Sequence, residues 1–577
     1  MLAFSGLGVR PLISPAEARY ALVAREMAES GDWIHPRLNH ARFYEKPPLT
    51  YWAVAASYRL FGFTELASRL PSAMAYVGTT AVTYFLAAEL LGAAAAPVAA
   101  LIYATSLGPY LFGRFLFTDT ILVFCLSVSL LGLARVVRRP ESLSRAGPLL
   151  FFLGAGFAGL AKGLIGLLFP FAAASAYALL ARDRDLVRRL RPGPGLAIAA
   201  LVFVPWHAAM AAGDPSFLAF YFGNEHVARF LGHRDPLNYT PLSIPAFWIS
   251  TALWAFPWIL FLPSALSRRR RAEGRRALAL AWIWVAVVVG FFTLTGSRLE
   301  YYALPAFPAL AVILASGWLR FVASGRPAAA VAAPSVIAVA LGLAAAPLVF
   351  LPASKGADVL TGLVASLDGY YREYFAEHPG ASMVFGAELL RRAQPLPIVL
   401  LLLAAATLAA LALRRRRAVL AMWVAGAVPI LGLADAGQLQ VAVDRSQRDA
   451  ARIVNREWTP RSRLMVTGDY EDSCGITFYT GQSTQVIGGP GPDLLFGFRR
   501  GDAPEVFVTP DEFLRAWDSD EDVFVLGGRD LTLPGATVLL EGPRSRLLVG
   551  NRCPPEDDVS GSLRVAARSL PSSPAEP

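Results

Sequence analysis

The residues with the clearest potential for chemistry lie in the stretch FYEKPPLTYW, residues 43–52 of a mostly apolar chain. This stretch places Glu45 beside Lys46, follows the pair with two prolines and surrounds it with aromatic residues. Proline restricts the backbone, and aromatic rings favour the interface between membrane and water. An aromatic-anchored turn would explain the rings but would leave the Glu–Lys pair unexplained. The stretch therefore predicts a functional site at a membrane surface.

Other charged residues stand at the ends of apolar stretches. Placing a charge at the edge of the membrane costs free energy, so a charged residue kept there indicates function. Any one of them could be an ordinary interfacial charge in water, but their convergence on one side of the predicted membrane favours a shared site. These residues are Glu17, Arg19, Arg114, Asp119, Lys162, Glu225, His226, Arg229, Arg298 and Glu300.

Lysine usage singles out two positions. Lysine and arginine total 53, yet the only lysines are Lys46, Lys162 and Lys355. Lysine is a compact point charge, whereas arginine presents a planar fork. A compact charge suits one phosphate oxygen, and Lys46 and Lys162 are the positions where this difference is expected to matter. Lys355, in the loop PASKGAD, is interpreted as a lysine retained by chance, without a functional role.

The composition indicates an integral membrane protein. Of the 577 residues, 55% are hydrophobic and only 17% are charged, which lies outside the range typical of soluble globular proteins. The net charge of +10 comes largely from short arginine runs between apolar stretches. Such runs indicate orientation in a membrane rather than a nucleic-acid partner.

Apolar stretches of about 17 to 22 residues, long enough to cross a hydrocarbon core, predict a transmembrane domain of about twelve helices over residues 72–434. The positive-inside rule places the arginine-rich loops in the cytoplasm, so residues 1–71 and 435–577 face outward. A first helix is then expected upstream of residue 1, unless the amino terminus is translocated without one. The expected spans are 72–91, 97–113, 121–137, 148–160, 164–181, 195–212, 243–264, 277–295, 303–322, 331–351, 396–413 and 418–434.

Residues 435–577 predict a small outer α/β domain. The segments RLMVTGDY, GITFYTG, EVFVTP and DVFVLGG are expected to be short strands, and DEFLRAWDSD a helix. The run GGPGP at 488–492 is expected to be a loop rather than a phosphate cradle, because no helix start follows it.

The succession of motifs resembles the aminoarabinose (lipid A) transferase branch of the dolichyl-phosphate-mannose protein mannosyltransferase superfamily. The similarity runs in unbroken order through AEARYALVAREMAESGDWIHPRLNHARFYEKPPLTYW, FGFTELASRLPSA, FGRFLFTDTILVF, GLAKG, FYFGNEHVARF and SRLEYYALPAFPAL. It implies a polytopic α-helical membrane protein of the GT-C fold with a small C-terminal α/β soluble domain. It also implies a bacterial inner-membrane glycosyltransferase, with its active site and C-terminal domain on the periplasmic side.

The implied reaction moves a sugar from a polyprenyl-phosphate donor to a lipid or glycan acceptor, with aminoarabinose and lipid A as the closest pair. A protein acceptor would make the chain similar to protein O-mannosyltransferases. A secondary transporter would also explain many helices, but it predicts inverted repeats and broken midplane helices, and the sequence shows neither.

The resemblance also implies roles for individual residues. Arg19, Lys46 and Lys162 are expected to bind the donor phosphate through charge-assisted hydrogen bonds. Glu45 and His226 match the family positions associated with a divalent metal, here zinc, magnesium or manganese, and both are reasonable zinc ligands. The substrate pocket is expected to include Tyr44, Arg229, Tyr301 and Tyr302, although anchoring at the membrane interface is an equal explanation for the last two.

The general base is left open by the sequence. Family members commonly carry an acidic pair in the first outer loop, where this chain has Ala16 followed by Glu17, and a later aspartate that matches Asp119. Either Glu17 takes over, or Asp119 acts alone, or the acceptor is an anion such as a phosphate that needs little deprotonation.

Overall fold

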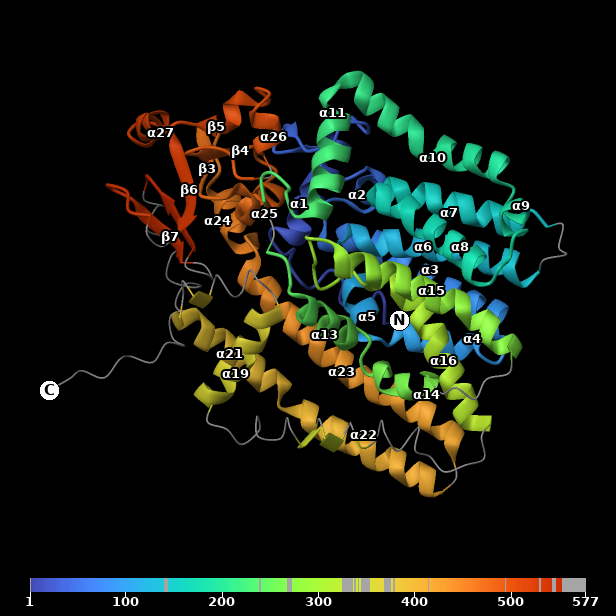
Figure 1. The fold of residues 1–577 in the computed structure, drawn as a ribbon. Coiled ribbons are helices and arrows are strands. Elements are labelled where there is room, and N and C mark those ends of the chain that lie inside the picture. Colours follow the sequence, from blue (N-terminus) through green and yellow to red (C-terminus); the bar gives the residue numbers. More distant parts are fainter. Residues whose placement is uncertain are drawn as a thin grey trace.

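The computed structural model describes most of the chain. The described residues are 2–139, 144–237, 240–266, 272–323, 353–367, 379–413, 415–492, 494–528, 531–541 and 546–552, with a few isolated positions between 336 and 376. Long helices form one part of the molecule, and a sheet with its own helices forms the other (Figure 1).

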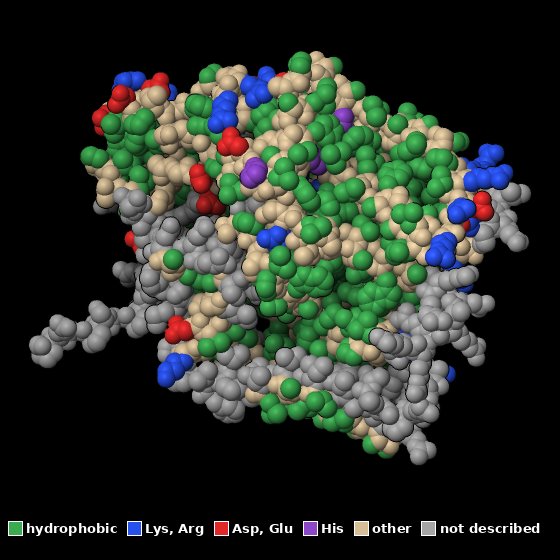
Figure 2. Space-filling view, viewed as in Figure 1, with side chains coloured by type: hydrophobic (Ala, Val, Ile, Leu, Met, Phe, Trp, Pro, Cys, Tyr) green, Lys and Arg blue, Asp and Glu red, His purple; other side chains and the backbone are tan. Residues whose placement is uncertain are grey.

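The long helices occupy the middle of the sequence and run roughly alongside one another (Figure 1). Hydrophobic side chains cover much of their outer face, and Lys and Arg side chains gather at the end near α9 (Figure 2). These elements are α3 (Glu65–Leu91), α4 (Ala96–Ala104), α5 (Leu107–Gly113), α6 (Thr118–Arg138), α7 (Ala146–Lys162), α8 (Leu164–Leu180), α9 (Leu186–Leu190), α10 (Pro192–Gly213), α11 (Ser216–Leu218), the π-helix η1 (Ala219–Ala228), α12 (Arg229–Leu231), α13 (Ile244–Trp254), η2 (Trp258–Phe261), α14 (Leu262–Leu266), α15 (Ala272–Leu294), η3 (Leu304–Ala306), α16 (Phe307–Ala323), α19 (Ala353–Leu367), α21 (Pro379–Ala393), α22 (Pro395–Ala412) and α23 (Arg416–Arg445).

Within the described residues, five helices are long and apolar enough to cross a membrane, and up to seven if each bent pair counts as one span. The bent pairs are α4 with α5, at 63°, and α13 with residues 258–266, at 93°. Every expected span except 331–351 falls on one of the helices or bent pairs, while 331–351 lies outside the described residues. The total of about twelve spans stays a prediction.

The N-terminal segment forms a small layer on the helices. It contains α1 (Ala16–Ser30), the two-stranded ribbon of β1 (Arg37–Leu38) and β2 (Ala41–Arg42), and α2 (Leu49–Phe61). Helix α1 ends at Gly31, whose φ of 75° is the left-handed conformation that favours glycine at a helix end. The turn after β2 carries the Glu45–Lys46 pair to the edge of the helical part.

The C-terminal region is built on a six-stranded sheet with the strand order β5-β4-β3-β6-β8-β7. Strands β5, β4, β3 and β6 are parallel, and β8 pairs antiparallel with both β6 and β7. Its elements are α24 (Arg448–Glu457), β3 (Ser462–Thr467), α25 (Tyr470–Thr480), β4 (Thr484–Ile487), α26 (Leu495–Phe498), η4 (Pro504–Val506), β5 (Phe507–Val508), α27 (Pro510–Trp517), β6 (Asp522–Gly528), β7 (Thr537–Glu541) and β8 (Arg546–Gly550).

One expected strand is wrong. The segment GITFYTG, residues 475–481, belongs to α25. Its β-branched and aromatic residues suggested a strand, but Asp469 precedes the helix, two acidic residues occupy its first turn, and Gly481 ends it with a φ of 71°. These end signals favour a helix through capping and the helix dipole.

The sheet region is joined to the N-terminal layer rather than separate from it. Buried residues of α1, α2 and α25 share one hydrophobic core with those of β3 and β6. Arg25 donates to the carbonyl of Phe478 at 2.5 Å, and the Asn39 side-chain amide donates to the carbonyl of Thr484 at 2.6 Å. The sheet region therefore fixes the position of α1, which carries part of the site.

Candidate active site

A cavity of about 430 Å³ lies where the N-terminal layer meets the helical part. It is bounded by α1, the turn after β2, the start of α6, the junction of α7 with α8, the η1 segment, the end of α15 and residues 297–302. Most of the site residues predicted from the sequence line it, namely Arg19, Glu45, Lys46, Asp119, Lys162, Glu225, His226, Arg229, Tyr301 and Tyr302. Five of the predicted residues are not among its lining residues: Glu17, Tyr44, Arg114, Arg298 and Glu300.

The cavity is lined by both charged and apolar side chains. Four cations, Arg19, Lys46, Lys162 and Arg229, lie among its lining residues. The apolar wall is formed by Leu164, Ile165, Leu168, Phe291 and Phe292, from α8 and α15. Such a site can hold an anionic head together with the start of an aliphatic chain.

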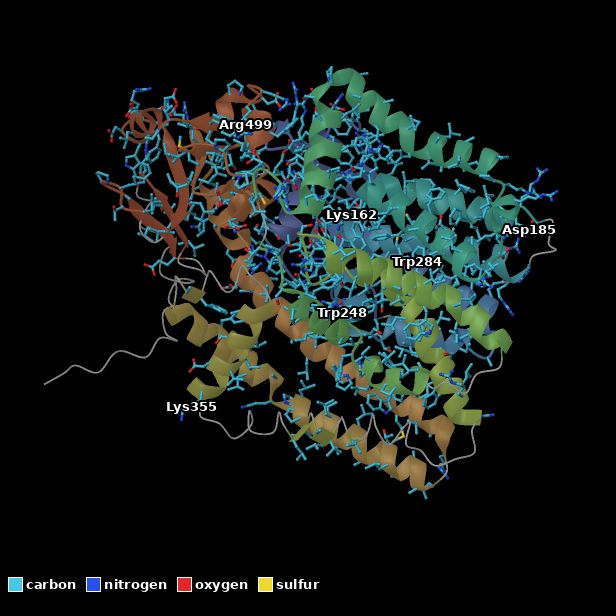
Figure 3. The ribbon with its side chains drawn as sticks, in the orientation of Figure 1. Lys162, Asp185, Trp248, Trp284, Lys355 and Arg499 are labelled. Carbon is cyan, nitrogen blue, oxygen red and sulfur yellow. The ribbon has the colours of Figure 1, made fainter. Side chains whose placement is uncertain are left out.

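Lys162 and Asp119 form a close ion pair at the cavity. The Lys162 ammonium, in the last turn of α7, donates to both carboxylate oxygens of Asp119 at 2.6 Å. It also lies 4.8 Å from the ring centroid of Tyr302 and 5.5 Å from that of Tyr301, within the range of cation–π attraction. Figure 3 shows Lys162 near the centre of the molecule. The two tyrosines therefore help to place this ammonium.

The turn at Gly163 brings α7 and α8 against η1. Gly163 has a φ of 69°, and a Cβ atom there would stand 2.1 Å from the His226 Nε2 atom and 2.4 Å from the Tyr221 hydroxyl. Only glycine combines this backbone conformation with such close packing. Gly163 thus sets the distance between Lys162 and His226.

A buried network of charges forms another wall. Arg234 donates to Glu45 and, at 2.5 Å, to Glu225. Arg229 donates to Glu225 at 2.7 Å, and the Lys46 ammonium lies 3.6 Å from Glu45 and 3.7 Å from Glu225. Three cations thus hold two carboxylates, which leaves the network with a net positive charge.

Burial and neighbouring charges shift the pKa values in this network in opposite ways. Burial raises the pKa of Glu45, but Arg234 and Lys46 outweigh it and hold that pKa well below its usual range. Burial, helped by Arg229, lowers the pKa of Lys46 to about 8 against the opposing effect of Glu45 and Glu225. Glu45 is therefore anionic at neutral pH, and the charge of Lys46 is lost in mildly alkaline solution.

The ring of His226 is held by the backbone on both sides. Its Nδ1 atom lies 2.7 Å from the carbonyl of Tyr221, and its Nε2 atom accepts the N–H of Leu164 at 3.1 Å. Burial is the main cause that lowers the pKa of His226, so the ring is neutral with its proton on Nδ1.

As these residues lie, they do not fit a metal site. A ligand nitrogen needs a free lone pair, and that of His226 Nε2 faces the Leu164 amide, while the Glu45 carboxylate is held by Arg234. Among the residues that the structure describes, no three His, Cys, Asp or Glu side chains group closely enough to hold an ion. The divalent metal stays a prediction, and no step is assigned to it.

Glu17 lies outside the cavity, buried behind it. Its carboxylate receives two hydrogen bonds from Arg69, at 2.7 and 2.6 Å, and a third from the N–H of Leu116 at 3.0 Å. Burial raises the pKa of Glu17, but Arg69 and Arg10 outweigh it and lower the net pKa. Glu17 and Arg69 are fully buried. This pair ties α1 to α3 and to the start of α6.

Tyr44 also lies outside the cavity. Its ring packs edge-on against that of Phe217, with 5.5 Å between the ring centroids. It also packs at a tilt against the ring of Phe496 of α26, with 5.1 Å between the centroids. It lines a neighbouring cavity instead. Tyr44 thus connects the turn that carries Glu45 to the C-terminal region.

Two charged residues that act on the site were not predicted from the sequence. Arg234 follows η1 in a polar loop and has no distinctive neighbours in the sequence. Glu471, in the first turn of α25, lies 3.3 Å from the Arg19 guanidinium, and both side chains are largely buried. Arg234 lies only nine positions from Glu225 but 189 from Glu45, and Glu471 lies 452 from Arg19, so the fold is what brings the two distant pairs together.

Comparison with known proteins agrees with this architecture. The family model of dolichyl-phosphate-mannose-protein mannosyltransferases matches residues 45–208. The undecaprenyl phosphate-alpha-4-amino-4-deoxy-L-arabinose arabinosyl transferase of Aeromonas hydrophila is 32% identical over 56% of this chain and 58% of its own length. The enzyme of the same name from Erwinia tasmaniensis is 30% identical over 60% and 62%. These alignments thus span less than two thirds of the relatives' length.

Solved structures cover more of the chain. ArnT from Cupriavidus metallidurans, bound to undecaprenyl phosphate, matches 96% of each chain with a TM-score of 0.77 and 25% identity. The apo state of the same protein matches 96% of each chain with a TM-score of 0.79 and 24% identity. The expected GT-C architecture, helical with a C-terminal sheet region, is confirmed. The chain therefore has the GT-C fold and is similar in sequence to the undecaprenyl phosphate-linked aminoarabinose transferases.

Proposed function

We propose that this protein is an inner-membrane glycosyltransferase that moves a sugar from a polyprenyl-phosphate donor to an acceptor at the periplasmic face, with aminoarabinose and lipid A as the substrate pair. The observation that carries the proposal is the cavity in which Arg19, Lys46, Lys162 and Arg229 meet an apolar wall. A phosphate joined to a polyprenyl chain needs both surfaces. The relatives named for undecaprenyl phosphate-linked aminoarabinose support this donor.

The cations would act on the leaving group. When the acceptor oxygen attacks the anomeric carbon, the bond from that carbon to the phosphate oxygen breaks, and its electron pair stays on the polyprenyl phosphate. Direct displacement inverts the configuration at the anomeric carbon. Preorganised cations in a site that excludes water stabilise the developing charge more than bulk water does. Lys46, Lys162 and Arg19 are proposed to supply this stabilisation.

Asp119 is proposed to fix the position of Lys162. It accepts two hydrogen bonds of 2.6 Å from the Lys162 ammonium, which hold that charge in the cavity lining. A phosphate acceptor is already anionic near neutral pH, because its second pKa lies near 6, and it needs little help from a base. Glu17 is excluded from proton transfer to the acceptor, since it lies behind the cavity with Arg69.

A transfer assay in liposomes tests this function. The assay would offer undecaprenyl-phosphate aminoarabinose and lipid A, and measure released undecaprenyl phosphate and modified acceptor. Lys162→Ala should lower the rate at least a hundredfold with folding intact, whereas Lys355→Ala on α19, whose side chain is exposed, should match the wild type. Donor that stays uncleaved by the wild type, or equal rates for both variants, would count against the proposal. Transfer to a protein in place of lipid A would identify a protein O-glycosyltransferase.

A further inference from the structure

A second cavity lies on the other side of Glu45. It has a volume of about 310 Å³ and is lined by residues of η1, by residues 234–236, by Pro492 and by residues from 495–500 in and after α26. Glu45 lines both cavities, and its partner Arg234 lines the second one. The two cavities thus meet at Glu45, next to the sheet region.

Two arginines at the edge of the second cavity are placed to receive an anion. Arg499 has a side chain that is 59% exposed, and its guanidinium lies 3.6 Å from Asp235, which is itself 76% exposed. An exposed ion pair of this length contributes little stability, so Arg499 can exchange Asp235 for another anion. Figure 3 labels Arg499 in the sheet region, near α26.

Arg500 provides a fixed charge beside it. Its guanidinium donates to the Ser216 hydroxyl at 3.1 and 2.5 Å, lies 3.6 Å from Asp214 and stacks 3.7 Å from the ring centroid of Phe496. These contacts preorganise one arginine, while its neighbour Arg499 projects from the surface. Planar guanidinium groups bind phosphate through paired hydrogen bonds.

The position of this cavity suits the second substrate of a displacement. An inverting displacement places the incoming and departing oxygens on opposite sides of the anomeric carbon. The donor phosphate is assigned to the cations of the first cavity, so the incoming group must arrive from another direction. The second cavity opens beside the same carboxylate, Glu45, and beside the η1 segment that lines the first cavity.

We propose that the second cavity binds the acceptor through an anionic phosphate headgroup of a membrane glycolipid, held by Arg499 and Arg500. This inference rests on the proposed transferase function and adds to it the place where the acceptor is recognised. The Phe220 and Phe496 side chains, 4.2 Å apart between ring centroids, form an apolar floor for the sugar ring that carries the phosphate.

Two-substrate kinetics in liposomes test the proposal with Arg499→Gln as the main variant. We expect the KM for a phosphorylated lipid acceptor to rise about tenfold or more, since a charge-assisted hydrogen bond is lost, while the KM for the donor stays unchanged. Arg515→Gln on α27 is the matched control, because it removes an exposed arginine from another face of the same region. Both variants should unfold at the wild-type temperature.

Inorganic phosphate provides a second readout. It should inhibit the wild type competitively against the acceptor, and the Arg499→Gln enzyme several-fold less. If the wild type transfers sugar but Arg499→Gln keeps its acceptor KM and its sensitivity to phosphate, the acceptor site is wrong although the transferase function stands. If the wild type cleaves no donor, the proposed function itself fails.

Discussion

Replacing Glu17 by glutamine should destabilise the protein rather than disable its chemistry. Glu17 and Arg69 have fully buried side chains joined by two hydrogen bonds. Breaking a buried ion pair by removing one charge costs about 3–5 kcal/mol, because the other charge is left uncompensated. The glutamine NH₂ group would also face a backbone N–H, either that of Ile13 or that of Leu116, both of which now donate to the carboxylate.

That cost is a large share of a typical folding free energy of about 5–15 kcal/mol. Glu29→Gln is the matched control on the same helix, since Glu29 pairs with Arg25 in an exposed i,i+4 arrangement that is worth about 0.3–0.5 kcal/mol. Thermal unfolding in detergent, followed by tryptophan fluorescence, should show a marked drop for Glu17→Gln and almost none for Glu29→Gln. The turnover of the folded fraction should stay near that of the wild type.

A double variant checks the physical reason. Glu17→Leu combined with Arg69→Met removes both charges of this hydrogen-bonded pair, and it should be more stable than either single variant because neither member of the pair is left buried without the other. A Glu17→Gln protein that unfolds at the wild-type temperature but has lost its turnover would refute this reasoning and would restore Glu17 as a catalytic group.

Three further predictions follow from the site. The pKa of Lys46 is about 8, so its charge is present below that pH and lost above it. The rate of donor cleavage should therefore fall as the pH rises through about 8. In Lys46→Arg, this fall should occur at a higher pH when the rate is measured as a function of pH. Gly163→Ala should lower the free energy of unfolding by at least about 2 kcal/mol through backbone strain and overpacking, and it should abolish turnover. Gly223→Ala, which has open space around the new methyl group, should change neither quantity in the same unfolding and activity assays. Glu471→Gln should change the KM for the donor several-fold with little change in kcat, because it releases Arg19; an unchanged donor KM would show that the sheet region does not tune the phosphate site.

The sequence predicted the apolar helices and the cavity-lining charges because both carry local signals. Long apolar stretches have few alternatives to a helix that spans or packs within a membrane. The Glu45–Lys46 pair and Lys162 stand out against an apolar, arginine-rich background. Residues such as these can therefore be assigned to a site before the fold is known.

The sequence could not predict which charges are paired. Arg234 holds Glu45 across 189 positions, and Glu471 holds Arg19 across 452. No local pattern marks either residue, because the energy that fixes it comes from burial and ion pairing in the folded chain. Glu17 is a further example of a residue whose partner the sequence does not reveal. Its position in the motif suggested catalysis, but in the folded chain it lies behind the cavity, paired with Arg69.

The departure at Ala16 has a physical explanation in this arrangement. The family's acidic pair would occupy the first turn of α1, and in this chain neither Ala16 nor Glu17 lines the cavity. An acidic residue at position 16 is therefore not needed to hold the donor cations, and Glu17 suffices to pair with Arg69. In the proposed reaction, Asp119 positions Lys162, and an acceptor that brings its own negative charge needs no general base. The arginines of the second cavity are proposed to bind such an acceptor.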